Sequence, residues 1–260
     1  MIGGHIGWSQ VAGSLALVAI AIALSIWRRV PLERELGIAV VRSFVQLIAL
    51  GYVIKLIFEA GNLGFTVPLL AAMVVFGAFT ARHRARRVPN GFWVLLFALG
   101  VSAAATLGLA LVVGALPATA RTIVPVGGMV LGNAMTSAAV ALSRLQDEVE
   151  RSAAEIEARL SLGATSRQAI DPALRRSLTA GMINVVDSTK TAGLVFIPGT
   201  TVGMLLGGAA PLDAIRLQLI LFYLLAGGVA IAVVLAATLA YRGFFTPAHQ
   251  LRDPSPFVIP

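Results

Sequence analysis

Apolar runs long enough to cross a bilayer make up most of the chain. Seven such runs follow one another along the 260 residues, at about 7–27, 36–58, 63–80, 91–116, 121–143, 178–206 and 212–240. A membrane-spanning helix needs roughly 20 mostly apolar residues. Since a helix satisfies its own backbone hydrogen bonds in lipid, the sequence predicts an all-α, polytopic membrane bundle of about seven transmembrane helices.

The composition leaves little room for a separate soluble domain. Hydrophobic residues make up 58% of the chain and charged residues only 12%, whereas soluble domains carry roughly 25% charged residues. Lipid must therefore cover part of the apolar surface, and we expect one transmembrane domain over residues 1–260. Cysteine is absent, which excludes disulfides and thiolate metal sites.

Lys and Arg are distributed unevenly between the two sides of this predicted bundle. The turns at 28–34 and 82–87, the polar stretch 144–176 and the C-terminal tail hold 15 of the 20 Lys and Arg residues. Such a bias places these segments in the cytoplasm, with the N-terminus outside and the C-terminus inside. The net charge of +8 then reflects topology and lipid contact, and no nucleic-acid partner is expected. The first run has no clear cleavage site, so we interpret it as a retained helix.

The polar segment at about 144–177 has its own helical pattern. Apolar residues recur at three- and four-residue steps, which is typical of an amphipathic helix: Leu145, Val149, Ala153, Ile156, Leu160 and Ala164. Gly163 interrupts this helix, Thr165 and Gln168 form a capping-box pattern, and Asp171-Pro172 resembles another helix start. The pattern predicts a helix, a glycine turn, a short helix and a new helix that enters the membrane.

Residues 157–164 read Glu-Ala-Arg-Leu-Ser-Leu-Gly-Ala. This stretch resembles the EAA-type coupling loop of ABC importer-like permeases, which has Glu-Ala and then Gly six residues after the Glu. The resemblance implies that Glu157, Ala158, Leu162, Gly163 and Ala164 contact an ATPase and transmit its motion. An ordinary amphipathic surface helix that ends at a glycine fits the same stretch equally well.

The segment that follows carries a second resemblance. Asp187–Val195, Ile197-Pro198-Gly199 and 206–215 are similar to the FetB-type (UPF0014) permease family, as are 41–47 and 132–136. The likeness extends from about residue 35 to 245, and Thr200-Thr201 depart from the Met-Thr pair that is usual in the family. Its bacterial members are described as iron exporters, and a plant relative is linked to aluminium tolerance. The resemblance therefore implies the membrane subunit of an ATP-driven exporter of iron, another metal or a metal chelate.

The energy source must lie on another chain if this resemblance holds. A P-loop needs Gly-x-x-x-x-Gly-Lys-Ser/Thr, but the only lysines are Lys55 and Lys190, and neither follows a glycine. We expect no enzymatic activity and no cofactor in this chain, with ATP and Mg²⁺ on a separate ABC ATP-binding subunit. The resemblance, with one coupling loop per chain, also implies a homodimer in the bacterial inner membrane.

Charged and amide side chains inside the runs are candidates for a translocation path, since such groups are costly in lipid. Arg42 and Gln46 are four residues apart in the second run, and Asn184, Asp187 and Lys190 lie in the sixth. Alternatively, Asp187 pairs with Lys190 or Arg42 only to hold the bundle together, or Arg42 extends to the cytoplasmic interface.

Two stretches of small residues suggest either a break in a helix that could act as a gate or close contact between helices. Pro198, Gly199 and Gly203 predict a broken helix or gate in the sixth run, although a kink with no transport role fits as well. The stretch at about 125–137 contains glycines, Asn133 and Thr136, which fit a dimer interface as well as a pathway.

The sequence leaves the substrate and any metal site unknown. The three histidines lie outside the runs, and oxygen ligands such as Asp187 and Asn184 suit hard ions. One carboxylate beside Lys190 is a poor site for a bare trivalent ion, so a chelate or a metabolite fits equally well. A secondary transporter or channel without an ATPase, and a membrane sensor without transport activity, remain the alternative functions.

Overall fold

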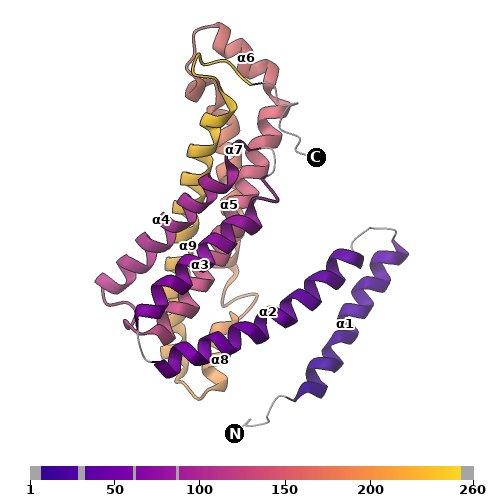
Figure 1. The fold of residues 1–260 in the computed structure, drawn as a ribbon, viewed down its shortest axis with the longest axis vertical. Coiled ribbons are helices and arrows are strands. Elements are labelled where there is room, and N and C mark those ends of the chain that lie inside the picture. The colour runs from indigo at the N-terminus through magenta and orange to yellow at the C-terminus, as the bar shows by residue number, and fades with distance from the viewer. Residues whose placement is uncertain (1–6, 29–32, 61–62, 86–87, 253–260) are drawn as a thin grey trace. The chain divides into compact units, whose positions relative to one another are not determined.

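A computed structural model describes residues 7–28, 33–60, 63–85 and 88–252. Over these residues the chain forms nine α-helices, two short 3₁₀ helices and no strand beyond two isolated bridges (Figure 1). The α-helices are α1 (Trp8–Trp27), α2 (Glu33–Ala60), α3 (Thr66–Ala81), α4 (Gly91–Val112), α5 (Ala120–Arg151), α6 (Ala153–Ser161), α7 (Ser166–Thr191), α8 (Gly199–Leu206) and α9 (Pro211–Ala240). The predicted all-α class is confirmed.

Among the described residues, five helices are long and apolar enough to cross a membrane, namely α1, α2, α4, α5 and α9, and α3 is a shorter apolar helix. Helix α7 is absent from this set because charged residues lie along most of its length, namely Arg167, Asp171, Arg175, Arg176, Asp187 and Lys190. Its second half covers only the first part of the predicted sixth run.

The chain divides into two compact units, Met1–Asn62 and Leu63–Pro260. The first unit is an α-hairpin of α1 and α2. In it the rings of Trp8 and Phe44 pack edge to face, with their centroids 6.0 Å apart. Almost no residue of either helix is buried within the unit. Such apolar, exposed helices are suited to contact with lipid or with other helices.

Helix α5 is the centre of the second unit and packs against α3, α4, α7 and α9. Small residues allow the close approach, as is common between membrane helices. Gly228 of α9 lies against Val130 of α5, and its carbonyl accepts a hydrogen bond of 2.6 Å from Ser102 Oγ of α4. Gly181 of α7 lies against Ala141 of α5 and Val233 of α9.

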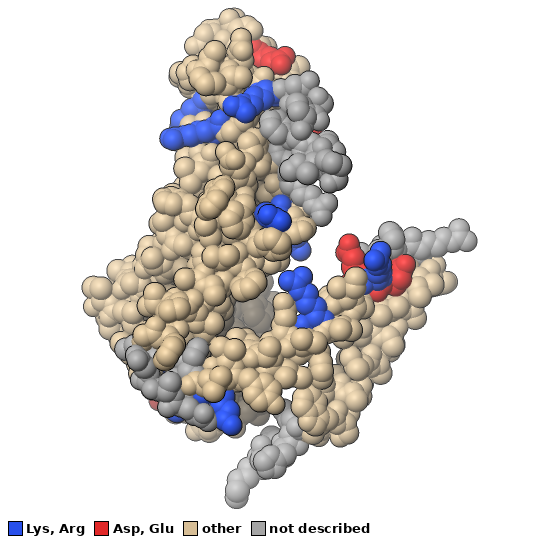
Figure 2. Space-filling view, in the orientation of Figure 1, with Lys and Arg blue, Asp and Glu red and all other residues tan. Residues whose placement is uncertain are grey.

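Three of the segments that the charge pattern predicts to be cytoplasmic belong to the second unit, and they meet at one end of it. A buried cluster joins the turn after α3 (Ala85), the end of α5 (Val149), α6 (Ile156), the start of α7 (Ile170) and the 3₁₀ helix that follows α9 (Tyr241). Figure 2 shows Lys and Arg side chains gathered close to α6 on the face in view. Arg29, Arg86 and Arg87, which the charge pattern counts, lie outside the described residues.

The predicted amphipathic helix over 144–164 is wrong in its start. Helix α5 continues without a break to Arg151, and only then does the chain turn at Ser152 into α6. Leu145 and Val149 therefore belong to the end of α5 and Ile156 to α6, and all three are buried in the same cluster. The apolar spacing persists across Ser152 because both helices cover the same core.

Helix α7 also differs from the prediction at its beginning. The capping box is confirmed, since Thr165 N donates to Gln168 Oε1 (2.9 Å) and Gln168 N donates to Thr165 Oγ1 (3.3 Å). The second start at Asp171-Pro172 is wrong, because α7 continues through Pro172. Proline removes one backbone donor, and the 2.6 Å ion pair between Asp171 and Arg175 spans that turn.

The sixth run is interrupted as predicted, but the interruption is longer. Helix α7 ends at Thr191, residues 192–198 form an irregular loop, and α8 begins at Gly199 with Pro198 as its N-cap. Gly193 in this loop has a φ of +80°, a backbone conformation that glycine adopts at little cost.

Candidate functional site

Helix α6 projects a polar surface from the basic end of the second unit. Its apolar side is anchored by Ile156, which is only 2% exposed. Glu157, Ala158 and Leu162 are exposed on the other side, and Leu162 retains 89% of its accessible surface. Gly163 ends the segment with a φ of +90°, which turns the chain into α7. Leu162 therefore lies free at the surface, beside the exposed Glu157 and Ala158.

A buried carboxylate lies where α5 and α7, the two helices that flank α6, pack together. Glu148, near the end of α5, is 5% exposed and accepts from Arg144 at 2.7 Å and from Arg176 of α7 at 2.6 Å. The Arg144 contact lies within α5, whereas the charge-assisted contact from Arg176 joins α7 to the end of α5. This ion pair therefore connects the two helices that flank α6.

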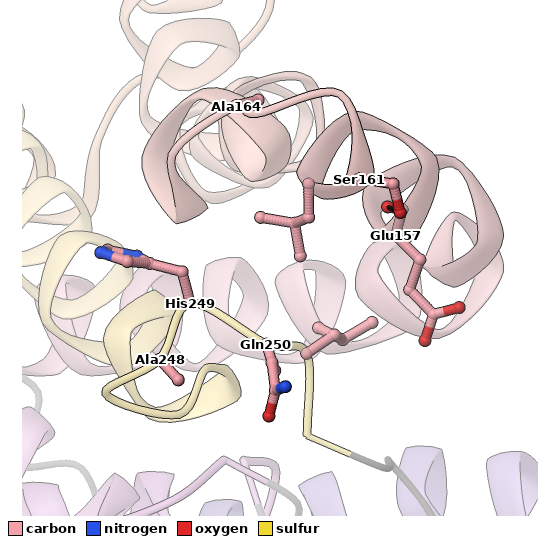
Figure 3. Close-up of a pocket in the computed structure, with 8 residues that line it drawn as sticks. Glu157, Ser161, Ala164, Ala248, His249 and Gln250 are labelled. Carbon is pink, nitrogen blue, oxygen red and sulfur yellow. Dashed lines mark hydrogen bonds between the residues drawn. The ribbon is translucent and has the colours of Figure 1, made fainter.

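A pocket of about 450 Å³ opens beside α6 (Figure 3). Glu157, Leu160, Ser161 and Ala164 form one wall, and residues 248–251 of the C-terminal segment form the other. The pocket therefore contains two of the predicted coupling residues, Glu157 and Ala164. The sequence pattern did not indicate the C-terminal segment, because a short polar stretch after the last helix has no periodicity.

The predicted path residues of α7 lie on its exposed second half. Asn184, Asp187 and Lys190 are all exposed, and no ion pair joins Asp187 to Lys190 within the described chain. Arg42 and Gln46 lie in the other unit, where they are exposed on one side of α2 beside Gly37, Ile38, Val41 and Val45.

Helix α5 also exposes polar side chains along the part that packs against α7. The two helices are antiparallel, since Gly181 lies against Ser137 and Ala141 while Arg176 is paired with Glu148. Thr136 of α5 is therefore at about the height of Asn184, and Asn133 at about the height of Asp187. Asn133 and Thr136 are exposed, and each side chain donates to a carbonyl of its own helix. Exposed amides and a carboxylate at membrane depth require a protein or water neighbour.

Helix α8 covers a small apolar pocket at the other end of the second unit. The pocket has a volume of about 310 Å³ and lies among the loop 192–198, α8 and α9. Pro198 lines it, while Gly199 and Gly203 face open space, so α8 is packed on one side only. Thr201 Oγ1 donates to Gln218 Oε1 at 3.2 Å, and this buried contact ties α8 to α9.

Sequence reasoning missed Gln218 and Glu148, although signals for both were present. Gln218 is a lone amide in the long apolar run that became α9, and an isolated polar residue there indicates a buried partner. Glu148 stands four residues after Arg144, which is the spacing of a helical ion pair. Over the residues that the structure describes, no three His, Asp or Glu side chains are grouped so that they could hold a metal ion.

Comparisons with known proteins place nearly the whole length of the chain in one family. Residues 8–245 match the family model described as "Uncharacterised protein family (UPF0014)". The chain is 37% identical to "UPF0014 membrane protein STAR2" of Oryza sativa subsp. japonica, over 95% of this chain and 87% of the relative. It is 36% identical to "Protein ALUMINUM SENSITIVE 3" of Arabidopsis thaliana, over 95% and 90%.

A bacterial relative has a name that states a transport role. The chain is 32% identical to "Probable iron export permease protein FetB" of Escherichia coli (strain K12), over 93% of each protein. No solved structure matches the chain. The match over nearly its full length, together with the helical bundle described above, shows that this chain is a membrane protein of the UPF0014 family.

Proposed function

We propose that the chain is the permease subunit of an ATP-driven exporter in the bacterial inner membrane, coupled to a separate ABC ATP-binding subunit. The observation that carries this proposal is α6, a short anchored helix with exposed Glu157, Ala158 and Leu162. The Glu148–Arg176 ion pair ties the flanking helices α5 and α7 together, so a partner that pushes α6 would move both. In the proposed topology α6 and the C-terminus are cytoplasmic and the N-terminus is outside.

The proposed transporter contains two copies of the chain. The exposed polar surfaces of α5 and α7, with Asn133, Thr136, Asn184 and Asp187, would face the same surfaces of the second copy. A two-fold axis then gives a polar path with side chains from both copies. Arg42, Gln46 and Lys190 are further candidates for this path, and α8 with Pro198, Gly199 and Gly203 is the candidate gate.

The proposed cargo is iron, another metal or a metal chelate. Support comes from the name of the Escherichia coli relative and from the oxygen-bearing side chains on α5 and α7, which suit hard metal ions. The name of the Arabidopsis thaliana relative refers to aluminium sensitivity, and aluminium is also a hard trivalent ion. Two copies would bring two Asp187 carboxylates to the path, which is a better match to a trivalent charge than one.

The proposal is tested by purification followed by transport. The affinity-tagged chain should co-purify with a subunit that contains a P-loop, identified by mass spectrometry. In inside-out vesicles, the pair should take up ferric citrate only when ATP is present. Uptake without any ATP-binding subunit would instead favour a secondary transporter or channel.

Asp187→Asn should reduce ATP-driven uptake at least tenfold, because it removes the proposed carboxylate from the path while preserving its shape. Binding of the ATP-binding subunit should remain at the wild-type level, since α6 is unchanged. Asp213→Asn is the matched control, because Asp213 is an exposed carboxylate paired with Arg216 on the surface of α9. Equal uptake by the Asp187 variant and the wild-type protein would exclude Asp187 from the path.

A further inference from the structure

The C-terminal segment that lines the pocket beside α6 is held in a defined conformation. Phe245 and Leu251 form an antiparallel bridge, and Thr246 N donates to Gln250 O at 2.8 Å. Arg252 N donates to Phe244 O at the same distance. Residues 245–251, here called the C-terminal hairpin, thus form a closed turn, because its two ends are joined by backbone hydrogen bonds.

The C-terminal hairpin is also attached to the coupling segment. A hydrogen bond of 2.7 Å joins His249 Nδ1 to Ser166 Oγ in the first turn of α7. Phe244 and Phe245 are buried in the same cluster as Ile156 of α6. His249 has a φ of +59°, a left-handed conformation that is unfavourable for residues other than glycine. The hydrogen bond to Ser166 and the closed turn hold it there.

The pocket between α6 and the C-terminal hairpin is suited to a cationic side chain. Of the residues that line it, only Glu157 carries a full negative charge and none is Lys or Arg. Within the described chain Glu157 has no ion-pair partner, whereas its neighbour Glu155 is paired with Arg159 at 2.6 Å. Leu160 and Leu251 add apolar wall to the pocket. An Arg or Lys side chain would place its charge near Glu157 and its stem against these leucines.

We propose that the C-terminal hairpin is the second half of the docking site for the ATP-binding subunit, and that a basic side chain of that subunit enters the pocket between the hairpin and α6. This inference rests on the proposed function, and it adds a surface that the coupling segment alone does not provide. His249 and Ser166 act as positioning residues, because they fix the hairpin at the distance from α6 that the pocket requires.

Two variants of the hairpin test this inference. Ala248→Phe fills the pocket from an exposed position, and Gln250→Lys supplies an internal cation that competes for Glu157. Each should raise the dissociation constant of the purified ATP-binding subunit, measured on the chain in nanodiscs, at least tenfold. Ala118→Phe is the control, since Ala118 is an exposed residue just before α5, at the end of that helix opposite to α6, and its effect should stay below threefold.

Thermal melting of each variant shows which variants are folded. If Ala248→Phe does not fold, the dissociation constant of Gln250→Lys alone tests the inference. Wild-type affinity in a folded hairpin variant overturns the inference. If Glu157→Lys weakens binding in the same assay while the hairpin variants do not, the proposed function stands and only the role of the hairpin fails. If Glu157→Lys also binds at the wild-type level, the coupling role of α6 fails with it.

Discussion

Glu157→Lys is expected to reduce permease-stimulated ATP hydrolysis to the level of the ATP-binding subunit alone. Glu157 is exposed on α6 and is the only acidic side chain in the pocket, so the substitution replaces attraction for a basic partner residue by repulsion. The measurement is the ATPase rate of the purified subunit with wild-type or variant permease in nanodiscs. Membrane insertion and melting temperature should not change, since the side chain makes no ion pair within the described residues.

Asp213→Lys is the control for this charge reversal. Asp213 lies in the first turn of α9, and the opposite end of α9 joins the cluster that contains α6. The variant loses an exposed ion pair with Arg216, which contributes at most about 1 kcal/mol to the free energy of unfolding. Full stimulation by the Asp213 variant and none by the Glu157 variant is the expected pair of results. If the Glu157→Lys variant still stimulates ATP hydrolysis, the proposed role of α6 in coupling is wrong.

Gly181→Ala is expected to destabilise the bundle strongly, although it adds only one methyl group. The new Cβ would lie 2.8 Å from Ala141 Cβ, 3.0 Å from the carbonyl oxygen of Ser137 and 3.0 Å from Val233 Cγ1. Neither a backbone oxygen nor an alanine Cβ can rotate away, so α7 must shift from α5 and α9. Overpacking of this kind costs about 1–3 kcal/mol, and the melting temperature in detergent should fall accordingly.

Gly227→Ala provides the comparison for this packing effect. Gly227 is also inside a long apolar helix, but a Cβ there would meet no atom within 4 Å. Alanine is favoured over glycine in a helix by roughly 1 kcal/mol, so the melting temperature should be unchanged or higher. Equal melting temperatures for the two variants would contradict the close packing of α7 against α5.

Local chemistry explains which parts of the fold were predictable from sequence. The capping box at Thr165 was predictable because both partners lie within one turn, and hydropathy located the long helices because lipid requires apolar length. The break at Ser152 was not predictable, since the apolar spacing continues across it. Pro172 was misleading because a proline can be tolerated inside a helix whose start is already fixed by a cap.

The candidate site was predictable only where one segment contains it. Glu157 to Ala164 form a continuous motif, so the exposure of Glu157, Ala158, Leu162 and Gly163 in and just after α6 could be expected. The pocket beside α6 needs residues 248–251, which lie far from α6 in the sequence and are brought there by the packing of α9 and by the His249–Ser166 hydrogen bond. Contacts of this kind depend on the tertiary fold.

Site-specific crosslinking from Leu162 tests the central claim most directly. A photoreactive amino acid at this position, which is 89% exposed at the end of α6, should form a covalent adduct with the ATP-binding subunit in intact cells. The same amino acid at Leu212, which is 70% exposed at the start of α9, should form none. An adduct from Leu162 alone is the predicted result. No adduct from Leu162, or an adduct from Leu212 instead, would contradict the account of α6 as the contact through which ATP hydrolysis drives the permease.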